Sequence, residues 1–380
     1  MEAELREAVR SLCERYPHEY WQEVDRARKY PEEFVRELTD AGFLACLIPE
    51  EYGGAGLGIR EACTILEEIN RSGGNSAACH AQMYTMGTLL AYGSAAQKKR
   101  YLPGIASGEL RLQAFAVTEP DAGSDTTRIT TVAKKQGDRY VVSGKKTFIS
   151  RVQHSDLMVL LARTTPLEQV EKKTRGLSVF LVDLRELGNG QMAVRPIDTM
   201  INHETNELFF DGLEIPEENL IGEEGEGFRY ILGGMNAERI LLASESVGDG
   251  YYFVDRCAAY AGERIVFSRP IGANQGVQFP IARAYIQIRA AAAMRDIAAA
   301  MYDNGESPGA EANMSKYLAS EAAWYAANVA MDTFGGYGLA EEYGIERKFR
   351  EARLYIVAPV SNNLVLAHVG QHVLGLPRSF

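Results

Sequence analysis

The sequence has no long hydrophobic run, no apolar N-terminal segment and no excess of positive charge. No run approaches the length needed to span a bilayer, and the first residues, MEAELREAVRSLCERY, are charged and amphipathic. We therefore expect neither a membrane span nor a secretory signal. The net charge of −11 and the pI near 5.2 argue against a nucleic acid or an anionic membrane as the main partner.

The sequence also lacks the cysteine and histidine spacings of metal sites. Its cysteines show no CxxC spacing, which is typical of reduced core residues in a cytoplasmic protein rather than of a disulfide framework. His368 and His372 stand four residues apart without a nearby acidic residue in the sequence, so we expect a helix end there and no metal. The five cysteines are Cys13, Cys46, Cys63, Cys79 and Cys257.

The chain of 380 residues is long enough for two or three domains, and its pattern changes twice. Residues 1–112 have helical periodicity, and residues 76–92 are apolar on nearly every side, which predicts a buried helix. Residues 113–225 contain short strands separated by turns, typical of a small antiparallel β-barrel. Residues 226–380 are helical again. We predict an α+β fold with these three domains.

The last of these domains is predicted to be a four-helix bundle. Its expected helical segments are about 227–247, 249–268, 275–303 and 308–333, joined by short loops. Arginines occur along them, and for most of these a solvated charged face is the simplest interpretation.

One stretch, from Phe115 to Ser150, combines a strand, a turn of small residues and a second strand region. The turn at 121–125 reads DAGSD, and the polar–apolar alternation that follows predicts a β-hairpin with turns at 137–138 and 143–145. A Gly/Ser turn lets backbone N–H groups approach a planar or anionic ligand closely. A surface turn without any ligand is equally compatible with this pattern.

Five strings, in this order, resemble the acyl-CoA dehydrogenase family, and the resemblance covers nearly every residue. They are PEEYGGAGLG at 49–58, AQKKRYLPGIASGE at 96–109, VTEPDAGSD at 117–125, ERIVFSRPIGANQ at 263–275 and FGGYGLAEEYGIERKFREAR at 334–353. The resemblance implies an N-terminal α-helical domain, a middle antiparallel β-barrel and a C-terminal four-helix bundle. It also implies FAD held non-covalently, oxidation of the Cα–Cβ bond of an acyl-CoA, electron transfer to an electron-transfer flavoprotein, and a homotetramer built as a dimer of dimers.

The resemblance assigns one group of FAD contacts to the 115–150 stretch. Phe115, Val117 and Thr118 match the strand against the isoalloxazine, with the Thr118 hydroxyl at the polar edge of the ring. Phe148 and Ser150 occupy the family's Trp-x-Thr positions, where phenylalanine keeps the aromatic face but loses the indole N–H.

A second group of FAD contacts lies in the C-terminal part. The matching residues are Arg264, Phe267, Gln275, Gly335, Gly336 and Ser361. Arg264, Phe267 and Gln275 match a segment that reaches the FAD of a neighbouring subunit, and a planar guanidinium suits pyrophosphate oxygens. Asp332 stands where the family commonly has glutamine, which puts that contact in doubt.

The chemistry requires a base for the Cα proton. Desolvation raises the pKa of a carboxyl group and so makes a carboxylate in an apolar pocket a useful base. Many family members carry this glutamate in a loop, at the position that Pro359 occupies here. Other members, of the isovaleryl-CoA and long-chain type, carry it on a helix in a Leu-x-x-Glu-Arg run, which MNAER at 235–239 resembles. Glu238 is therefore the predicted base, although an exposed Glu-Arg pair is the simpler alternative.

The same resemblance predicts where the acyl-CoA binds and which other activities stay open. Ser124, Met235, Asn236 and Arg239 are the predicted substrate contacts. The alternatives within the fold are an enoyl-CoA reductase and a non-oxidative acyl-CoA lyase or desulfinase. An inactive flavoprotein or CoA-binding scaffold is the alternative outside enzyme chemistry.

Overall fold

The computed structural model describes residues 2–378, which divide into two compact units. The sheet unit comprises residues 28–57 and 77–235, and the helical unit comprises residues 2–27, 58–76 and 236–378. The division differs from the three predicted domains because the first helices are shared between the two units. The three-domain boundaries stay a prediction.

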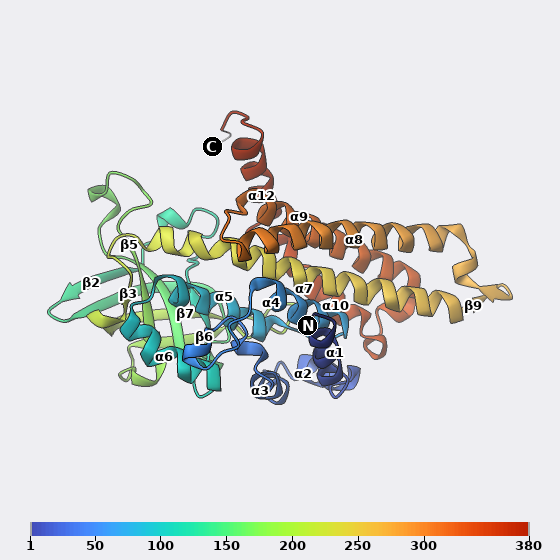
Figure 1. Ribbon diagram of the computed structural model, residues 1–380, viewed down its shortest axis with the longest axis horizontal. Coiled ribbons are helices and arrows are strands. Elements are labelled where there is room, and N and C mark those ends of the chain that lie inside the picture. Colours follow the sequence, from blue (N-terminus) through green and yellow to red (C-terminus); the bar gives the residue numbers. More distant parts are fainter. Residues whose placement is uncertain (1, 379–380) are drawn as a thin grey trace. The chain divides into compact units, whose positions relative to one another are not determined.

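Helices occupy both ends of the chain (Figure 1). They are α1 (Glu2–Cys13), α2 (His18–Arg26), α3 (Glu32–Asp40), α4 (Ile59–Arg71), α5 (Ala77–Tyr92), α6 (Ala95–Ser107), α7 (Gly227–Glu263), α8 (Gln275–Asp303), α9 (Gly309–Phe334), α10 (Ile345–Ala352), α11 (Leu354–Val357) and α12 (Asn362–His368).

Strands occupy the middle of the chain, with one small hairpin later. They are β1 (Leu112–Ala116), β2 (Val132–Gln136), β3 (Arg139–Ser150), β4 (Leu157–Arg163), β5 (Leu177–Asp183), β6 (Met192–Pro196), β7 (Thr205–Pro216), β8 (Leu220–Ile221), β9 (Ile265–Val266) and β10 (Arg269–Pro270).

The sheet unit is built around β4 and β5, in which all seven residues of each strand are buried. Both strands are apolar on both faces, so alternate residues enter two different cores. Leu157, Val159 and Leu161 pack in the core that also contains α5 and α6, whereas Met158 and Leu160 pack in a core shared with β3 and β7. The predicted helix at 76–92 is confirmed as the largely buried α5.

The sheet is open rather than a closed barrel. Its strand order is β6-β7-β3-β2-β4-β5-β8, and β1 pairs with β4 in parallel. β6 and β8 are the ends of this path, so the predicted closed barrel is wrong although the overall fold class is confirmed. The second core lies against β3 and β7, which shows that the open sheet buries both faces of its central strands.

The hairpin predicted between residues 132 and 150 is confirmed at only one of its two turns. Gln136 pairs with Arg139, so residues 137–138 form a two-residue turn, and Gly137 has a φ of 64°. No turn occurs at 143–145, because β3 continues through these residues to Ser150. A register shift between Val142 and Ser143 takes the place of that turn.

The helical unit is built around α7, α8 and α9, and Figure 1 shows α8 and α9 running side by side. Their shared core is rich in alanine, which allows close approach of the helices, and it contains Ala243, Ala291, Ala319 and Ala322. The shorter α10, α11 and α12 follow these long helices.

The helix break predicted near residue 248 is wrong, because α7 is one helix of 37 residues. Gly248 and Gly250 serve packing instead of ending the helix. A Cβ at Gly248 would lie 2.3 Å from the Glu67 carbonyl oxygen, and one at Gly250 would lie 1.9 Å from Ile288 Cδ1. These glycines therefore let α4 and α8 approach α7 closely.

Candidate flavin and substrate site

The predicted flavin residues of the sheet unit are brought together by contacts between two segments. β1 ends at Ala116, and the Thr147 N–H donates to the Thr118 carbonyl oxygen at 2.9 Å. The buried Lys146 Nζ donates to the Val117 carbonyl oxygen, also at 2.9 Å. Val117 and Thr118 are thereby fixed beside the end of β3, where Phe148 and Ser150 lie.

A buried ion pair reinforces this junction. Lys146 Nζ lies 3.0 Å from Glu119 Oε1, and neither side chain is more than 4% exposed. Glu119 also accepts hydrogen bonds from the N–H and hydroxyl of Thr130 and from the N–H of Thr131. Burial alone would raise the pKa of Glu119, but Lys146 and these donors lower it to about 2.

Phe148 stands out from the strand that contains it. The pairing of β3 with β7 shifts register between Lys146 and Ile149, and Phe148 has a φ of 59°. Such a conformation is uncommon for an aromatic residue, and it turns the ring away from its buried neighbours Thr147 and Ile149. The side chain is 62% exposed, so it offers an aromatic face to a planar ligand.

An aromatic row leads from α5 to Phe115. The rings of Tyr84 and Phe115 lie 5.3 Å apart and nearly perpendicular, and those of His80 and Tyr84 lie 5.1 Å apart. On the same helix, Gln82 Oε1 and Thr85 Oγ1 are buried without a hydrogen-bond partner among the described residues. Ser124 lies in the exposed turn at 121–125.

Glu238, the predicted base, lies on α7 in the helical unit and is 7% exposed. The next residue, Arg239, donates from Nη1 to Asn236 Oδ1 at 3.1 Å, whereas its Nε is buried and has no hydrogen-bond partner among the described residues. Burial lowers the pKa of Arg239, and the Glu238 charge offsets part of this effect. Asn236 and Arg239 are thus brought together beside Glu238, and Met235 precedes them at the end of the sheet unit.

The loop that carries Pro359 is held to α9 by a buried lysine. Lys316 Nζ donates to Asn362 Oδ1 at 2.6 Å, and Asn362 donates to Ser320 and Glu321. Burial and the charge of Arg239 lower the pKa of Lys316 to about 8. The Lys316–Asn362 bond therefore fixes the start of α12, directly after the loop at 358–361, against α9.

That loop contains no carboxylate. It reads Ala358-Pro359-Val360-Ser361, and Ser361 caps α12 by accepting a hydrogen bond from the Leu364 N–H at 3.4 Å. His368, at the end of α12, has a pKa lowered by burial and then by His372 and Arg239. The two histidine rings lie 4.9 Å apart.

The remaining predicted flavin residues gather at the far end of α7. The Arg264 guanidinium lies 5.8 Å from the centre of the Tyr337 ring, which places it beside the segment Gly335–Gly338. A Cβ built at Gly335 or Gly336 meets no atom within 4 Å, and Gly335 has a φ of 58°. Phe267, at the tip of the β9–β10 hairpin, is 96% exposed, and Gln275 is exposed at the start of α8.

These observations fit FAD. The exposed Phe148 ring beside the fixed Thr118 segment suits the isoalloxazine, because aromatic faces pack on planar rings. The open backbone of Gly335 and Gly336 next to the Arg264 guanidinium suits a pyrophosphate-linked adenosine. Two residues of this site that sequence reasoning missed are Lys146 and Glu119. The only sign of them in the sequence is that each is a charged residue near apolar residues of a predicted strand.

Three sequence profiles of one family match the chain. They describe the N-terminal domain (residues 1–109), the middle domain (114–213) and the C-terminal domain (225–374) of acyl-CoA dehydrogenase. The chain belongs to the acyl-CoA dehydrogenase family. It is an FAD-dependent oxidoreductase that acts on acyl-CoA.

Individual relatives agree with this assignment over nearly the whole chain. The acyl-CoA dehydrogenase FadE12 of Mycobacterium tuberculosis is 38% identical over 383 residues, which cover 99% of this chain and 96% of the relative. The 3-(aryl)acrylate reductase of Clostridium sporogenes is 34% identical over 357 residues, 93% of each chain. A solved glutaryl-CoA dehydrogenase–glutaryl-CoA complex has a TM-score of 0.91, 32% identity and coverage of 100% of this chain and 96% of that one.

Residues 2–378 contain neither a candidate membrane span nor a cluster of metal-ligating side chains. Within these residues, the structure has no helix that is both long and apolar enough to cross a membrane. No group of three or more His, Cys, Asp or Glu side chains in the described part is arranged to hold a metal ion.

Proposed function

We propose that this acyl-CoA dehydrogenase uses Glu238 as the base that removes the Cα proton of its substrate. The supporting observation is a glutamate that is 7% exposed on α7, together with a loop at 358–361 that contains no carboxylate. Bound FAD would supply the acceptor for the hydride that leaves Cβ. The product is the trans-2-enoyl-CoA, and the proton stays on the Glu238 carboxylate.

The other residues of the chain bind and orient the substrate and the flavin. Arg239 and Asn236, which hydrogen-bond to each other, are proposed to contact the acyl-CoA together with Met235 and Ser124. The buried Nε–H of Arg239 has no hydrogen-bond partner among the described residues, so it can donate to the acyl-CoA. Thr118 and Phe148 are proposed to orient the isoalloxazine of the FAD, and Arg264 to bind the pyrophosphate of the FAD of a neighbouring subunit.

Replacing Glu238 with glutamine tests the assignment. We expect Glu238→Gln to retain FAD and to lower α,β-dehydrogenation by roughly 10²–10⁴-fold or more, since the amide cannot accept the proton. Turnover is measured with an artificial electron acceptor, and bound flavin by its visible absorbance. Glu263→Gln makes the same change at the exposed end of α7 and serves as the matched control. Near-wild-type turnover of Glu238→Gln would falsify the assignment.

A second candidate is the reverse reaction, reduction of an enoyl-CoA. The observation in its favour is the 34% identical relative named 3-(aryl)acrylate reductase. The two directions are distinguished by comparing two anaerobic rates: bleaching of the oxidised flavin by a panel of saturated acyl-CoAs, and reoxidation of the reduced flavin by the matching enoyl-CoAs. The panel should include branched, cyclic and longer acyl groups, since Ala358, Pro359 and Val360 are small or apolar. A lyase, a desulfinase or an inactive scaffold would leave the flavin oxidised with every member.

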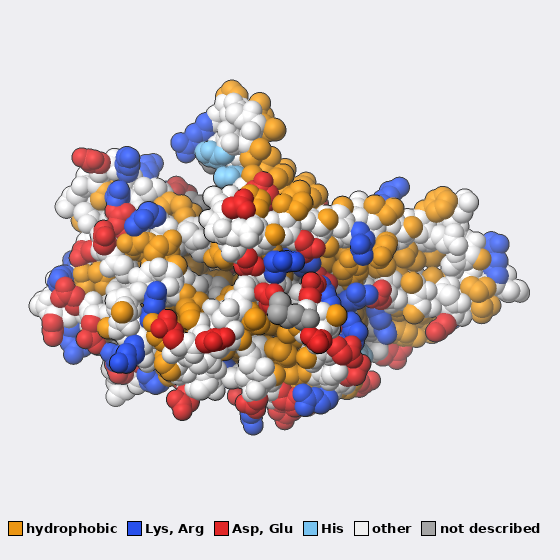
Figure 2. Space-filling view, viewed as in Figure 1, with side chains coloured by type: hydrophobic (Ala, Val, Ile, Leu, Met, Phe, Trp, Pro, Cys, Tyr) orange, Lys and Arg blue, Asp and Glu red, His pale blue; other side chains and the backbone are white. Residues whose placement is uncertain are grey.

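We further propose that the enzyme is a homotetramer, a dimer of dimers, that passes electrons to an electron-transfer flavoprotein. The support is the exposed apolar surface of the helical unit, which Figure 2 shows in orange along α8 and α9. Phe267 at the hairpin tip and Ile286 on α8 are 96% and 66% exposed. Analytical ultracentrifugation of the wild type and of Phe267→Asp tests this. We expect a tetramer for the wild type, and smaller species with less bound FAD for the variant.

A cytoplasmic location is also proposed. All five cysteines are free and buried, which suits a reducing compartment. Fractionation of cells that produce the protein at its natural level tests this location.

A further inference from the structure

A cavity of about 330 Å³ lies within the helical unit, and none of its lining residues is among those assigned above to flavin or substrate. It is formed by α1, α4, α7 and α8. Its lining residues are Arg6, Arg10, Glu67, Glu68, Arg71, Tyr251, Arg289, Ala292, Ala293, Arg295 and Asp296. Its volume is at the lower end of the range for sites that bind small metabolites.

The lining is unusually rich in arginine. It contains five arginines against three acidic side chains, so it carries two more positive than negative charges. In a protein with a net charge of −11, this local excess is opposite in sign to the molecule as a whole. Figure 2 shows basic and acidic side chains intermixed where Figure 1 labels α1 and α4.

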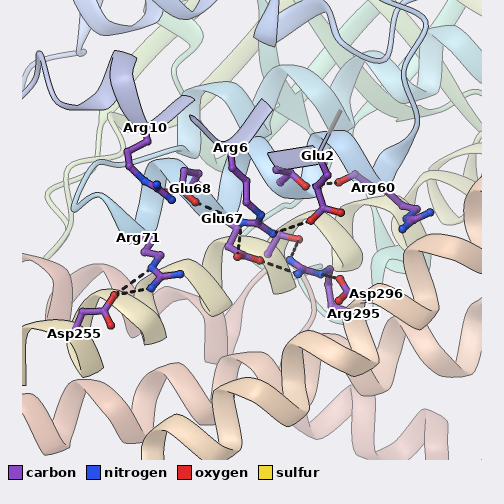
Figure 3. A network of polar contacts seen from close by, with 12 residues as sticks. Glu2, Arg6, Arg10, Arg60, Glu67, Glu68, Arg71, Asp255, Arg295 and Asp296 are labelled. Carbon is purple, nitrogen blue, oxygen red and sulfur yellow. Dashed lines mark hydrogen bonds and ion pairs between the residues drawn. The ribbon is translucent and has the colours of Figure 1, made fainter. Parts of the chain in front are cut away.

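The inner part of the lining is already neutralised. Arg6 and Arg295 both contact Glu67, at 2.8 and 2.7 Å, and Arg10 lies 2.9 Å from Glu68 (Figure 3). Glu67 and Glu68 are nearly fully buried, so these pairs stabilise the floor of the cavity. Arg295 also lies 2.7 Å from Asp296, so these three arginines are matched by the three acidic side chains of the lining. The positive excess of the lining therefore comes from the other two arginines, one of which pairs with a carboxylate outside the lining.

Those other arginines are Arg71 and Arg289. The Arg71 guanidinium lies 4.7 Å from the centre of the Tyr251 ring and forms an ion pair at 3.1 Å with Asp255, which is 54% exposed. Arg289 is exposed on α8 and forms no ion pair among the described residues. Arg71, Arg289 and Tyr251 all line this one cavity, so the two guanidinium groups and the tyrosine border the same space.

We propose that this cavity binds a small oxyanion, the phosphate or carboxylate group of a metabolite, through Arg71, Arg289 and the Tyr251 hydroxyl. Guanidinium groups pair with phosphate and carboxylate oxygens through two parallel hydrogen bonds. The Tyr251 hydroxyl adds a neutral donor, and the Glu67 and Glu68 pairs hold the arginine floor in place. The ligand enters a site separate from the acyl-CoA and flavin residues.

The binding test uses the FAD-loaded enzyme with inorganic phosphate and succinate as separate probes. Isothermal titration and the shift in melting temperature are compared with potassium chloride at equal ionic strength, which removes general screening. The visible absorbance of the flavin is followed in parallel, because displacement of FAD would indicate binding at the flavin site instead. We expect saturable binding of at least one probe without loss of flavin.

Arg289 is the better position for a substitution, because Arg71 also lines a neighbouring cavity and its loss would affect both. We expect Arg289→Gln to weaken probe binding about tenfold or more, and Arg289→Lys to retain part of it, since lysine keeps the charge but lacks the planar fork. Arg283→Gln removes an exposed arginine of the same helix outside the lining and should bind the probe like the wild type.

Three results would overturn the proposal. The first is equal stabilisation by phosphate, succinate and chloride at the same ionic strength, which would show that the arginines serve internal ion pairs only. The second is equal probe binding by Arg289→Gln and Arg283→Gln. The third is no binding by the assembled enzyme at all, which would indicate that another subunit or an internal side chain fills the cavity.

Discussion

Each compact unit contains one lysine–carboxylate pair that is almost completely shielded from solvent. In the sheet unit Lys146 lies 3.0 Å from Glu119, and in the helical unit Lys348 lies 2.5 Å from Asp249. The pKa values of the two carboxyl groups nevertheless move in opposite directions. That of Glu119 is lowered to about 2, whereas burial raises that of Asp249 to about 7.

Burial is the largest influence on the pKa of both carboxyl groups, and the neighbouring Glu351 charge raises the pKa of Asp249 further. The number of hydrogen-bond donors adds to this difference. Glu119 accepts two backbone N–H bonds and one hydroxyl bond in addition to Lys146. Asp249 receives one hydroxyl bond, from Tyr355 at 3.1 Å, and no backbone N–H among the described residues. Lys348 also lies 3.0 Å from Glu351, so its charge is shared between two carboxyl groups. A lysine alone does not offset the cost of burying a carboxylate, whereas a set of backbone donors does.

Removing Lys146 should have the largest effect. We expect Lys146→Met to cost about 3–5 kcal/mol of stability, because Glu119 would remain charged and buried. The Val117 carbonyl would also lose its donor, so bound FAD should decrease. Melting temperature and the ratio of flavin to protein measure the two effects. Lys145→Met, at the neighbouring half-exposed lysine, is the control and should cost no more than about 1 kcal/mol.

Removing Lys348 should have a smaller effect, about 1–3 kcal/mol, although this lysine is equally buried. Asp249 can take up a proton once its partner is lost, because its pKa is already near 7, and Glu351 keeps its 2.7 Å ion pair with Arg347. The melting temperatures of Lys348→Met and Lys146→Met are compared at one pH. A loss for Lys348→Met as large as that for Lys146→Met would contradict this explanation of the two pairs.

The smallest effect for a single measured step is the change of stability with pH, at most about 1.4 kcal/mol per pH unit for each group. The folded-state pKa of Asp249, about 7, lies above the ordinary 3.8, so the folded protein binds more protons between these values. Its contribution to stability is therefore present at low pH and is lost as the pH rises toward 7. For Glu119 the contribution is present above about 4.5 and is lost as the pH falls toward 2.

Melting temperatures at pH 5, 6 and 7 test these signs. Asp249→Asn should gain stability relative to the wild type as the pH rises, because the variant has no carboxyl group to ionise. Glu119→Gln should show a constant difference over this range, since Glu119 is ionised throughout. A constant difference for Asp249→Asn would instead show that Asp249 keeps its charge at pH 5.

The parts of the fold that depend on local pattern could be predicted from the sequence. The apolar run at 77–92 correctly predicted a buried helix, and Gly137-Asp138 correctly predicted a two-residue turn. The helix break expected near residue 248 was wrong, and the packing role of Gly248 and Gly250 could not be predicted because it depends on Glu67 and Ile288, which are distant in sequence. The closed barrel was wrong for a similar reason, since the order of the strands depends on pairings between distant segments.

The candidate site divides in the same way. The resemblance to acyl-CoA dehydrogenases indicated which residues should contact the flavin and the substrate. The assignments of Glu238 and of the flavin residues stay predictions. The side chains that hold these segments could not be predicted, because each acts across a long stretch of chain. Glu119 meets Lys146, and Lys316 meets Asn362, only after folding. Lysine is usually exposed, so the sequence alone predicts a surface position for a lysine whose buried partner is distant in the chain.

The continuity of α7 restricts how this chain can change in length. One inserted residue after Glu238 would rotate every later residue of the helix by about 100° and advance it by about 1.5 Å. Gly248 and Gly250 would then leave the surfaces of Glu67 and Ile288, and Arg264 would leave the Tyr337 ring. A substitution in α7 changes the contacts of one position, whereas an insertion or a deletion changes the contacts of every later position. Length variation among relatives should therefore concentrate in the β9–β10 hairpin and in the 304–308 connection.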